Sequence, residues 1–321
     1  MFAVYLLRAL TLLVAATALC FALLTLSPID PVRAYVRQNP GVTQEHIARM
    51  EQFWGVGTPP IERYVNWLGA ALRGDLGDSL IFRRPVLEII AGRAGASLAL
   101  MFTAWTFSGL FGLAAGCLMG MRHRRLADRA LRRFCLVMCS VPAFWVGLLM
   151  LGVFSVRLGW FPFGMAMPIG AAPQDVTPLQ WAHHIILPAL TLSVLSFPKI
   201  ALHTREKLLE VLASDYVLFA RARGLSEWEI LRRHALPAVL IPALTMQFAS
   251  FGELFGGSLV AESIFSYPGL GMAAAAAGLQ GDAPLLLGIT LFSALLIFVG
   301  NAIANALYPL LDPRQRGGGK P

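Results

Sequence analysis

Long runs of apolar residues with few charges recur along the chain, and their spacing indicates how it is organised. A helix that crosses a membrane needs about 20 mostly apolar residues. Six runs meet or approach that length, at residues 9–27, 96–121, 134–156, 185–203, 239–261 and 283–308. The pattern predicts an all-α fold: a polytopic membrane protein with six transmembrane helices in a single transmembrane domain over residues 1–321.

The first two runs carry further information. Residues 9–27 fit either a signal peptide or a first membrane helix, but the apolar part of a signal peptide spans only about 7–15 residues, and we interpret the run as a helix. In the second run, Gly112, Gly116 and Gly120 recur every four residues. Small residues at this spacing let two helices approach closely, so we expect this face to pack against another helix.

Basic residues are distributed unevenly between the loops. Residues 122–133 and 205–233 each contain six Lys or Arg, whereas the short loops on the other side of the membrane contain Arg157 alone. Cytoplasmic loops carry the excess of Lys and Arg in membrane proteins. The pattern therefore predicts that both termini and the 204–237 loop are cytoplasmic, and that residues 28–95 form an extracytoplasmic segment between the first two helices.

Composition supports a membrane protein. The chain is 57% hydrophobic and 14% charged, whereas a soluble domain has about 25% charged residues. The net charge of +8 would also fit a nucleic-acid partner. Because the basic residues lie where topology requires them, we expect no nucleic-acid partner. The four cysteines lie within apolar runs and are interpreted as small hydrophobic residues.

The 28–95 segment is the largest part of the chain outside the predicted helices. An amphipathic stretch at residues 43–53, with Thr43 as a capping residue, predicts a helix on the outer surface. Glycine-rich turns follow at residues 74–77. We expect this segment to pack on the helix bundle as a lid rather than to form a separate domain.

The 204–237 loop has the pattern of two short helices separated by a glycine. Gly224 permits a left-handed C-cap after the first helix. Ser226 can cap the second helix, with Glu229 three residues later as its capping-box partner. In the first helix, small residues stand beside Arg221 and Arg223, which suits docking into a groove of a partner protein. The alternative is a solvated connector.

This loop resembles the EAA loop of permeases from bacterial ABC importers, and in particular their dipeptide, oligopeptide and nickel branch. Ala220, Gly224, Leu236 and Pro237 match the EAA spacing, whereas Leu218 and Phe219 depart from it. The resemblance implies that the loop couples to an ATPase. The residues that would do so are Asp215, Ala220, Arg221, Ala222, Arg223, Gly224, Leu225, Leu236 and Pro237.

Further motifs extend the resemblance over almost the whole chain, in the order typical of the family. They are Asp30-Pro31, Gly74-Asp75-Leu76-Gly77 with Ser79, Val141-Pro142-Ala143-Phe144-Trp145, Ile186-Leu187-Pro188-Ala189-Leu190 and the motif from Glu262 to Gly271.

The family implies a type I ABC importer permease fold in the bacterial cytoplasmic (inner) membrane. It also implies a second permease subunit, distinct from this one, two cytoplasmic ABC ATPases and an extracytoplasmic substrate-binding protein. No Gly-Lys-Ser/Thr phosphate-binding motif occurs in the sequence. We therefore expect no cofactor on this chain and ATP with Mg²⁺ on the partner subunits.

Charged residues inside membrane helices are costly, and they mark either a transport path or a buried pair. Lys199 and Glu253 stand out on this ground, with Glu262 as a third candidate for the path. Glu253 either meets an amine-bearing or cationic substrate or pairs with a residue such as Lys199. A similar Gly252-Glu253-Leu254 in the nickel members of the family keeps nickel or a metal chelate beside di- and oligopeptides as the cargo.

Other chemistry has less support. His183 and His184 are adjacent and so point in different directions on a helix, and they lack the spacing of a ligand set. Cys135 and Cys139 share a helical face but are better explained as core residues. No hydrolase motif is present, so we predict no catalytic residues and no metal site. The remaining alternative is an ion-coupled secondary transporter, although no internal repeat supports it.

Overall fold

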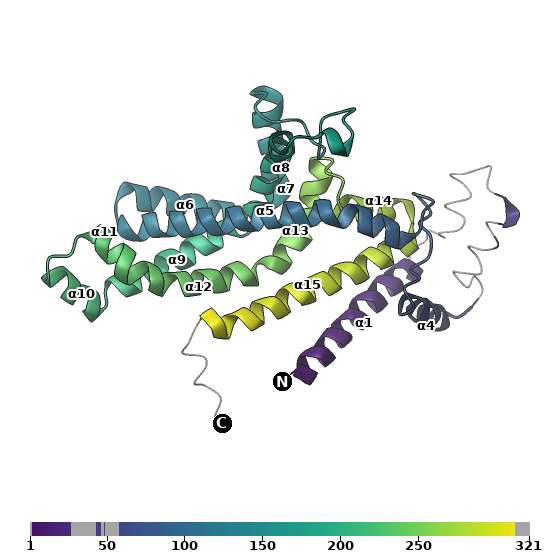
Figure 1. Ribbon diagram of the computed structural model, residues 1–321, viewed down its shortest axis with the longest axis horizontal. Helices are drawn as coiled ribbons and strands as arrows, with labels where there is room; N and C mark the ends of the chain where they lie inside the picture. Colours follow the sequence, from purple (N-terminus) through teal and green to yellow (C-terminus); the bar gives the residue numbers. More distant parts are fainter. Residues whose placement is uncertain (1, 27–42, 46–47, 49–57, 312–321) are drawn as a thin grey trace. The chain divides into compact units, whose positions relative to one another are not determined.

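The computed structural model describes residues 2–26, 43–45, 48 and 58–311 (Figure 1). Within these residues the protein is all-α, and the only β-type pairing is an isolated bridge between Asp78 and Pro85. The described residues divide into two compact units, one within residues 1–97 and 268–298 and the other within residues 98–267 and 299–321. Most of the predicted 43–53 helix lies outside the described residues.

The first unit contains three complete helices and the beginnings of two longer ones. These are α1 (Phe2–Leu26), α4 (Pro60–Ala71), the beginning of α5 (Val86–Met121), α14 (Leu270–Gln280) and the beginning of α15 (Ala283–Leu311). Phe21 of α1, Trp67 of α4 and Leu287 of α15 are buried against one another. Val86 and Ile90 of α5 pack with Leu270 of α14 in a second cluster.

A buried carboxylate links the 74–82 region to the start of α15. Ser79 Oγ donates a hydrogen bond to Asp282 Oδ2 at 2.5 Å, and the backbone N–H of Ile81 donates to the same oxygen at 3.0 Å. The N–H of Leu285, in the first turn of α15, donates to Asp282 Oδ1 at 3.2 Å. Burial raises the pKa of Asp282 above its usual range. These bonds give Ser79, which follows the Gly74–Gly77 motif, a structural role.

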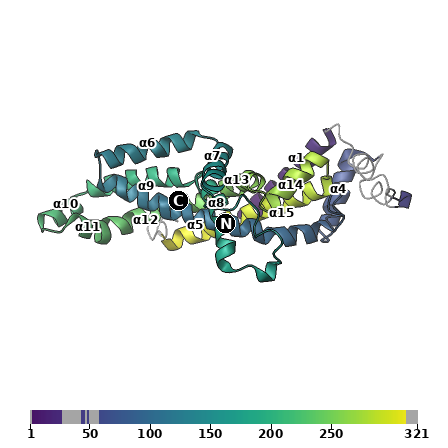
Figure 2. The same ribbon diagram turned by 90° about the horizontal axis from the view of Figure 1, so that it is seen from above.

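The second unit is built from α5 to α13 (Figure 2). Its elements are the rest of α5, α6 (Leu126–Ser140), α7 (Ala143–Met150) with the π-helical Leu151–Arg157, α8 (Pro178–Ser193), α9 (Phe197–Leu212), α10 (Asp215–Ala222), α11 (Glu227–Ile230) with the π-helical Leu231–Ala235, α12 (Leu236–Ala249) and α13 (Phe251–Ile264). The final part of α15 also belongs to this unit.

The glycines predicted to form a packing face on α5 lie directly against α9. A Cβ atom at Gly112 would lie 2.7 Å from Ile200, and one at Gly120 would lie 2.5 Å from Leu208. Between them, a Cβ atom at Gly116 would overlap Thr204 and lie 2.7 Å from the carbonyl oxygen of Ala201. The prediction from their spacing is confirmed, since only residues without a side chain permit this approach.

Three of the six predicted membrane helices are broken. α6 and α7 bend by 111°, α8 and α9 by 58°, and the segment ending in α12 bends by 50° from α13. The expectation of one continuous helix over 134–156 is therefore wrong, because Pro142 at the start of α7 cannot continue the hydrogen bonding of α6. Pro198 likewise follows the α8–α9 break. At the third break, Ser250 Oγ donates to the carbonyl of Gln247, an arrangement that bends helices.

In the part of the chain that the structure describes, two helices are long and apolar enough to cross a membrane: Val86–Met121 and the Ala283–Ile303 part of α15. The number rises to five if each bent pair is one span. In α1 the apolar part, Leu10–Leu26, is shorter. The second helix begins at Val86, ten residues before the predicted start. The prediction started late because Glu88 and Arg93 interrupt the apolar pattern there. α14 was not predicted at all, since its eleven residues are too few to suggest a span.

Candidate functional site

The 204–237 segment folds locally as its sequence predicts. α10 ends before Gly224, whose φ of 85° is left-handed, and the N–H of Leu225 reaches back to the carbonyl of Ala220 at 3.2 Å. α11 opens with a capping box in which Ser226 Oγ accepts from the N–H of Glu229, and Glu229 Oε2 accepts from the N–H of Ser226 at 3.0 Å. The helix–glycine–helix arrangement and both caps are confirmed. α10 and α11 lie beyond the ends of α9 and α12 (Figure 2).

A small core and an ion pair hold α10 and α11 together. Val217 and Ala220 of α10 are buried against Ile230 of α11. Arg221 donates two hydrogen bonds to Glu227, from Nε to Oε1 at 2.8 Å and from an Nη atom to Oε2 at 3.0 Å. This two-point contact has a favourable geometry for a carboxylate. It also raises the pKa of Arg221 above its usual value.

The face that this arrangement leaves exposed differs from the one expected. Ala220 packs inward and Arg221 is bound to Glu227, whereas Ala222 and Arg223 are exposed, so only part of the expected small-residue and arginine surface is free. Large apolar side chains are exposed beside them. They are Tyr216, Leu218, Phe219 and Trp228. Two of these, Leu218 and Phe219, are the residues that depart from the EAA pattern. Large apolar residues at these two positions are the feature of the sequence that could have indicated this surface. We call these four residues the α10–α11 apolar face.

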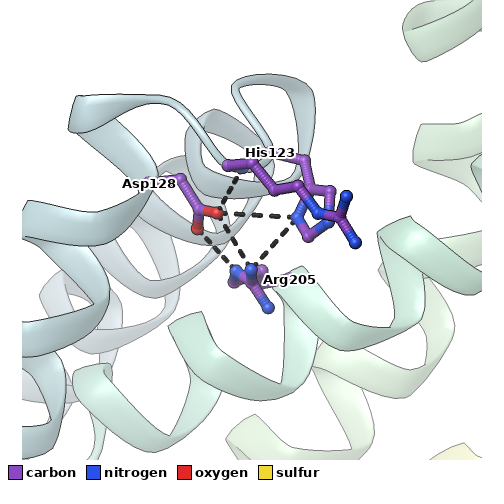
Figure 3. Close-up of polar contacts among 4 residues, drawn as sticks. His123, Asp128 and Arg205 are labelled. Atoms are coloured by element: carbon purple, nitrogen blue, oxygen red, sulfur yellow. Dashed lines mark hydrogen bonds and ion pairs between the residues drawn. The ribbon is translucent and has the colours of Figure 1, made fainter.

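A buried ion pair fixes α9 to the beginning of α6 (Figure 3). Arg205 donates to Asp128 from Nε to Oδ1 at 2.6 Å and from an Nη atom to Oδ2 at 2.9 Å. The N–H of Arg124 donates to Asp128 Oδ2 at 2.9 Å, and His123 Nδ1 lies 3.2 Å from the Arg205 guanidinium. The sequence reading missed this cluster, although Asp128 is the one acidic residue in the arginine-rich 122–133 loop.

The two charged residues singled out in the predicted fourth and fifth membrane helices meet in the structure. Lys199 Nζ donates to Glu253 Oε2 at 2.6 Å. The pairing alternative left open by the sequence is therefore the observed one. Glu262 is nine residues after Glu253, which places it on the opposite side of α13, and it is fully buried. The structure does not bring Glu262 to the Lys199–Glu253 pair.

The two histidines bind backbone carbonyls of the 158–177 loop. His183 Nε2 lies 2.7 Å from the carbonyl oxygen of Trp160, and His184 Nδ1 lies 3.1 Å from that of Gly164. The N–H of Met165 also donates to the carbonyl of Phe265, beyond the end of α13, at 2.8 Å. These contacts give His183 and His184 a structural role in holding the loop. Cys135 is buried among apolar residues of α5 and α9, as expected of a core residue, but Cys139 is exposed, so the same expectation is wrong for Cys139.

Comparison with known proteins identifies what this arrangement resembles. A family model described as "binding-protein-dependent transport system inner membrane component" matches residues 112–317. The match includes the whole of the 204–237 segment and both members of the Lys199–Glu253 pair.

Two relatives resemble the chain over nearly its whole length. The oligopeptide transport system permease protein AppB of Bacillus subtilis is 32% identical over 309 residues, which are 96% of each chain. The di/tripeptide transport system permease protein DppB of Pseudomonas aeruginosa is 34% identical over 315 residues, which are 94% of each chain.

A solved structure shares the fold. A chain of the inward-facing MetNI methionine ABC transporter superposes with a TM-score of 0.56 at 18% identity, covering 70% of this chain and 97% of that one. This likeness supports the all-α permease fold that the sequence predicts.

Proposed function

The chain belongs to the family of binding-protein-dependent transport system inner membrane components, and from this we propose that it forms half of the translocation path of an ATP-driven importer of di- or oligopeptides. The names of its relatives support peptides as the cargo. We propose that a second, distinct permease forms the other half, with both termini of this chain in the cytoplasm of a bacterium. An extracytoplasmic binding protein would deliver the peptide.

The observation that carries the coupling mechanism is the α10–α11 apolar face. Exposed aromatic side chains grouped on one small element are typical of the energetic centre of a protein–protein interface. We propose that each permease presents such a face to one of two cytoplasmic ATPases, which bind ATP and Mg²⁺. The wider coupling site comprises the residues from Asp215 to Leu225, with Leu236 and Pro237 at the start of α12.

The connection from this face to the membrane helices is short and stiff. α9 leads directly into α10, and it is held to α6 by Arg205 and Asp128 and to α5 by the glycine contacts. Movement of an ATPase at α10 would therefore reach the bundle through α9. Opening and closing of the path on its two sides would then follow ATP binding and release.

The transport function is tested by uptake of a labelled tripeptide into proteoliposomes that contain the permease, its copurifying partners and the binding protein. We expect uptake to require ATP and to persist when ion gradients are abolished. Uptake that needs a gradient and not ATP would instead indicate a secondary transporter. ATP-driven uptake of Ni²⁺ without any peptide would indicate a metal as the cargo.

Replacing Phe219 by aspartate is expected to abolish ATPase binding. Phe219 belongs to the α10–α11 apolar face and is 65% exposed. If Phe219 is an aromatic anchor of the interface, its loss costs about 2 kcal/mol or more, which is at least about 30-fold in affinity, and the new carboxylate would also have to be desolvated. The measurement is the amount of ATPase that copurifies with the permease.

Phe163→Asp is the matched control. Phe163 is 67% exposed but lies in the 158–177 loop, so the same substitution should leave the ATPases bound. Equal loss of ATPase from both variants, or from neither, would contradict the assignment of the docking face.

A further inference from the structure

The ion pair between Lys199 and Glu253 occupies an unusual place. Each residue is the third of its helix, so both lie directly beyond a break in a bent pair of membrane segments. Eleven residues separate Glu253 from the end of α13, which corresponds to about 16 Å of helix. That is close to half of a hydrocarbon core about 30 Å thick. Broken helices at this depth form substrate sites in many transporters.

The pair is also exposed. The side chain of Lys199 is 47% exposed and that of Glu253 is 52% exposed. Because charged groups at this depth are strongly disfavoured in lipid, this face of α9 and α13 does not lie against hydrocarbon. It must lie against water, a polar passage or polar groups of a partner.

The same face of α13 is open beyond the ion pair. Gly256 is one turn after Glu253, and a Cβ atom placed there would meet nothing within 4 Å. Ser263, two turns further along, is exposed as well. Leu259, on the same side of α13, is 39% exposed. The other side of the helix carries the buried Leu254 and Ala261. A face that carries a charged pair, is opened by a glycine and is left uncovered by the described residues of its own chain has the properties of a passage wall.

Both charged groups retain bonding capacity. Among the described residues, Lys199 and Glu253 each have the other as their one hydrogen-bond partner. An ammonium group has three donors and a carboxylate has two acceptor oxygens, so each can accept a further ligand before the pair separates. This contrasts with Asp128 and Arg205, where both carboxylate oxygens are occupied.

We infer that the Lys199–Glu253 pair receives the charged ends of the peptide substrate, with Lys199 binding the terminal carboxylate and Glu253 the terminal ammonium. This inference rests on the proposed function. A zwitterionic peptide replaces one ion pair by two, and every charge keeps a counter-charge within the membrane. A lone cation or anion would leave one of the two residues unpaired, so the pair selects for cargo that carries both charges.

The inference is tested with the complete reconstituted importer and one tripeptide in four forms: free, N-acetylated, C-amidated and blocked at both ends. For each form, uptake by a variant is divided by uptake by the wild type, which cancels the preference of the unchanged binding protein. Glu253→Gln should lower this ratio about tenfold for the free and the amidated peptide. It should keep the ratio at one or above for the N-acetylated peptide, because this peptide no longer leaves Glu253 unpaired. Lys199→Gln should lower it for the free and the acetylated peptide and keep it at one or above for the amide, which no longer leaves Lys199 unpaired.

Two controls separate recognition from a structural role. Glu88→Gln breaks the exposed pair with Arg84 at the start of α5 and should change no ratio. The double variant Lys199→Gln/Glu253→Gln leaves no unpaired charge, and it should still transport the free peptide poorly while the peptide blocked at both ends is unaffected. Full uptake of the free peptide by the double variant, or equal losses for all forms in the single variants, would overturn the inference. Failure of the wild type to import any peptide with ATP would overturn the proposed function itself.

Discussion

Replacing Arg205 by methionine should lower the free energy of unfolding by about 3–5 kcal/mol. Methionine keeps much of the volume of arginine but removes both hydrogen bonds to Asp128. The side chain of Asp128 is only 3% exposed, so its charge would be left in the interior with the N–H of Arg124 and the imidazole of His123 beside it. The measurement is unfolding in detergent micelles with increasing denaturant, which reports the stability change directly.

A double variant of the ion pair and a variant of an exposed ion pair on the same helix serve as controls. Asp128→Leu/Arg205→Met removes both charges, and it should recover most of the loss because no unpaired charge remains. Lys207 lies half a turn further along α9 and pairs with Glu210 at the surface. Lys207→Met should leave stability almost unchanged, since exposed ion pairs contribute little. A large loss in the double variant, or a small one in Arg205→Met, would contradict the assignment of a structural ion pair.

Gly116→Ala is expected to destabilise the protein by about 1–3 kcal/mol, although alanine is the better helix former. The added methyl group would overlap Thr204 and lie 2.7 Å from the backbone oxygen of Ala201. A backbone atom cannot move aside as the end of a flexible side chain can. α9 must therefore separate from α5, which also weakens the contacts of Gly112 and Gly120.

The same substitution at Gly92 is the control. Gly92 also lies in α5, and a Cβ atom there would meet nothing within 4 Å. Gly92→Ala should be neutral or stabilise the protein by up to about 1 kcal/mol. Both variants are compared by thermal unfolding in detergent, together with the amount of ATPase that copurifies. Equal behaviour of the two variants would show that close packing against α9 is not what the glycine face provides.

Sequence reasoning succeeded where a property belongs to a single segment. The apolar runs indicated the helices, the four-residue spacing of Gly112, Gly116 and Gly120 indicated close packing, and Ser226 with Glu229 indicated a capping box. Each of these depends on residues within one or two turns of a helix, so the chain order contains the whole signal. The family was accessible for a related reason, since its motifs are local and occur in a fixed order.

Properties that depend on distant residues were not accessible in the same way. Nothing in the sequence around Asp128 shows that Arg205, 77 positions later, is its partner. Whether Ala220 of α10 faces inward or outward depends on Ile230 of α11. The break at Ser250 has no proline at its centre, and it depends on which carbonyl the serine hydroxyl binds. By contrast, Pro142 stands at the α6–α7 break, and the residue before a proline is a probable helix end.

The contacts of the 158–177 loop restrict how this chain can change shape. Through His183, His184 and Met165, the loop is bonded both to the beginning of α8 and to the backbone just beyond α13. A Cβ atom at Gly164 would overlap the carbonyl of Phe265, so the two backbones are also in direct contact. We therefore expect these two helix ends to move as one rigid body. Hinge rotation during a transport cycle would then be confined to the breaks before Phe197 and at Ser250, on either side of the Lys199–Glu253 pair.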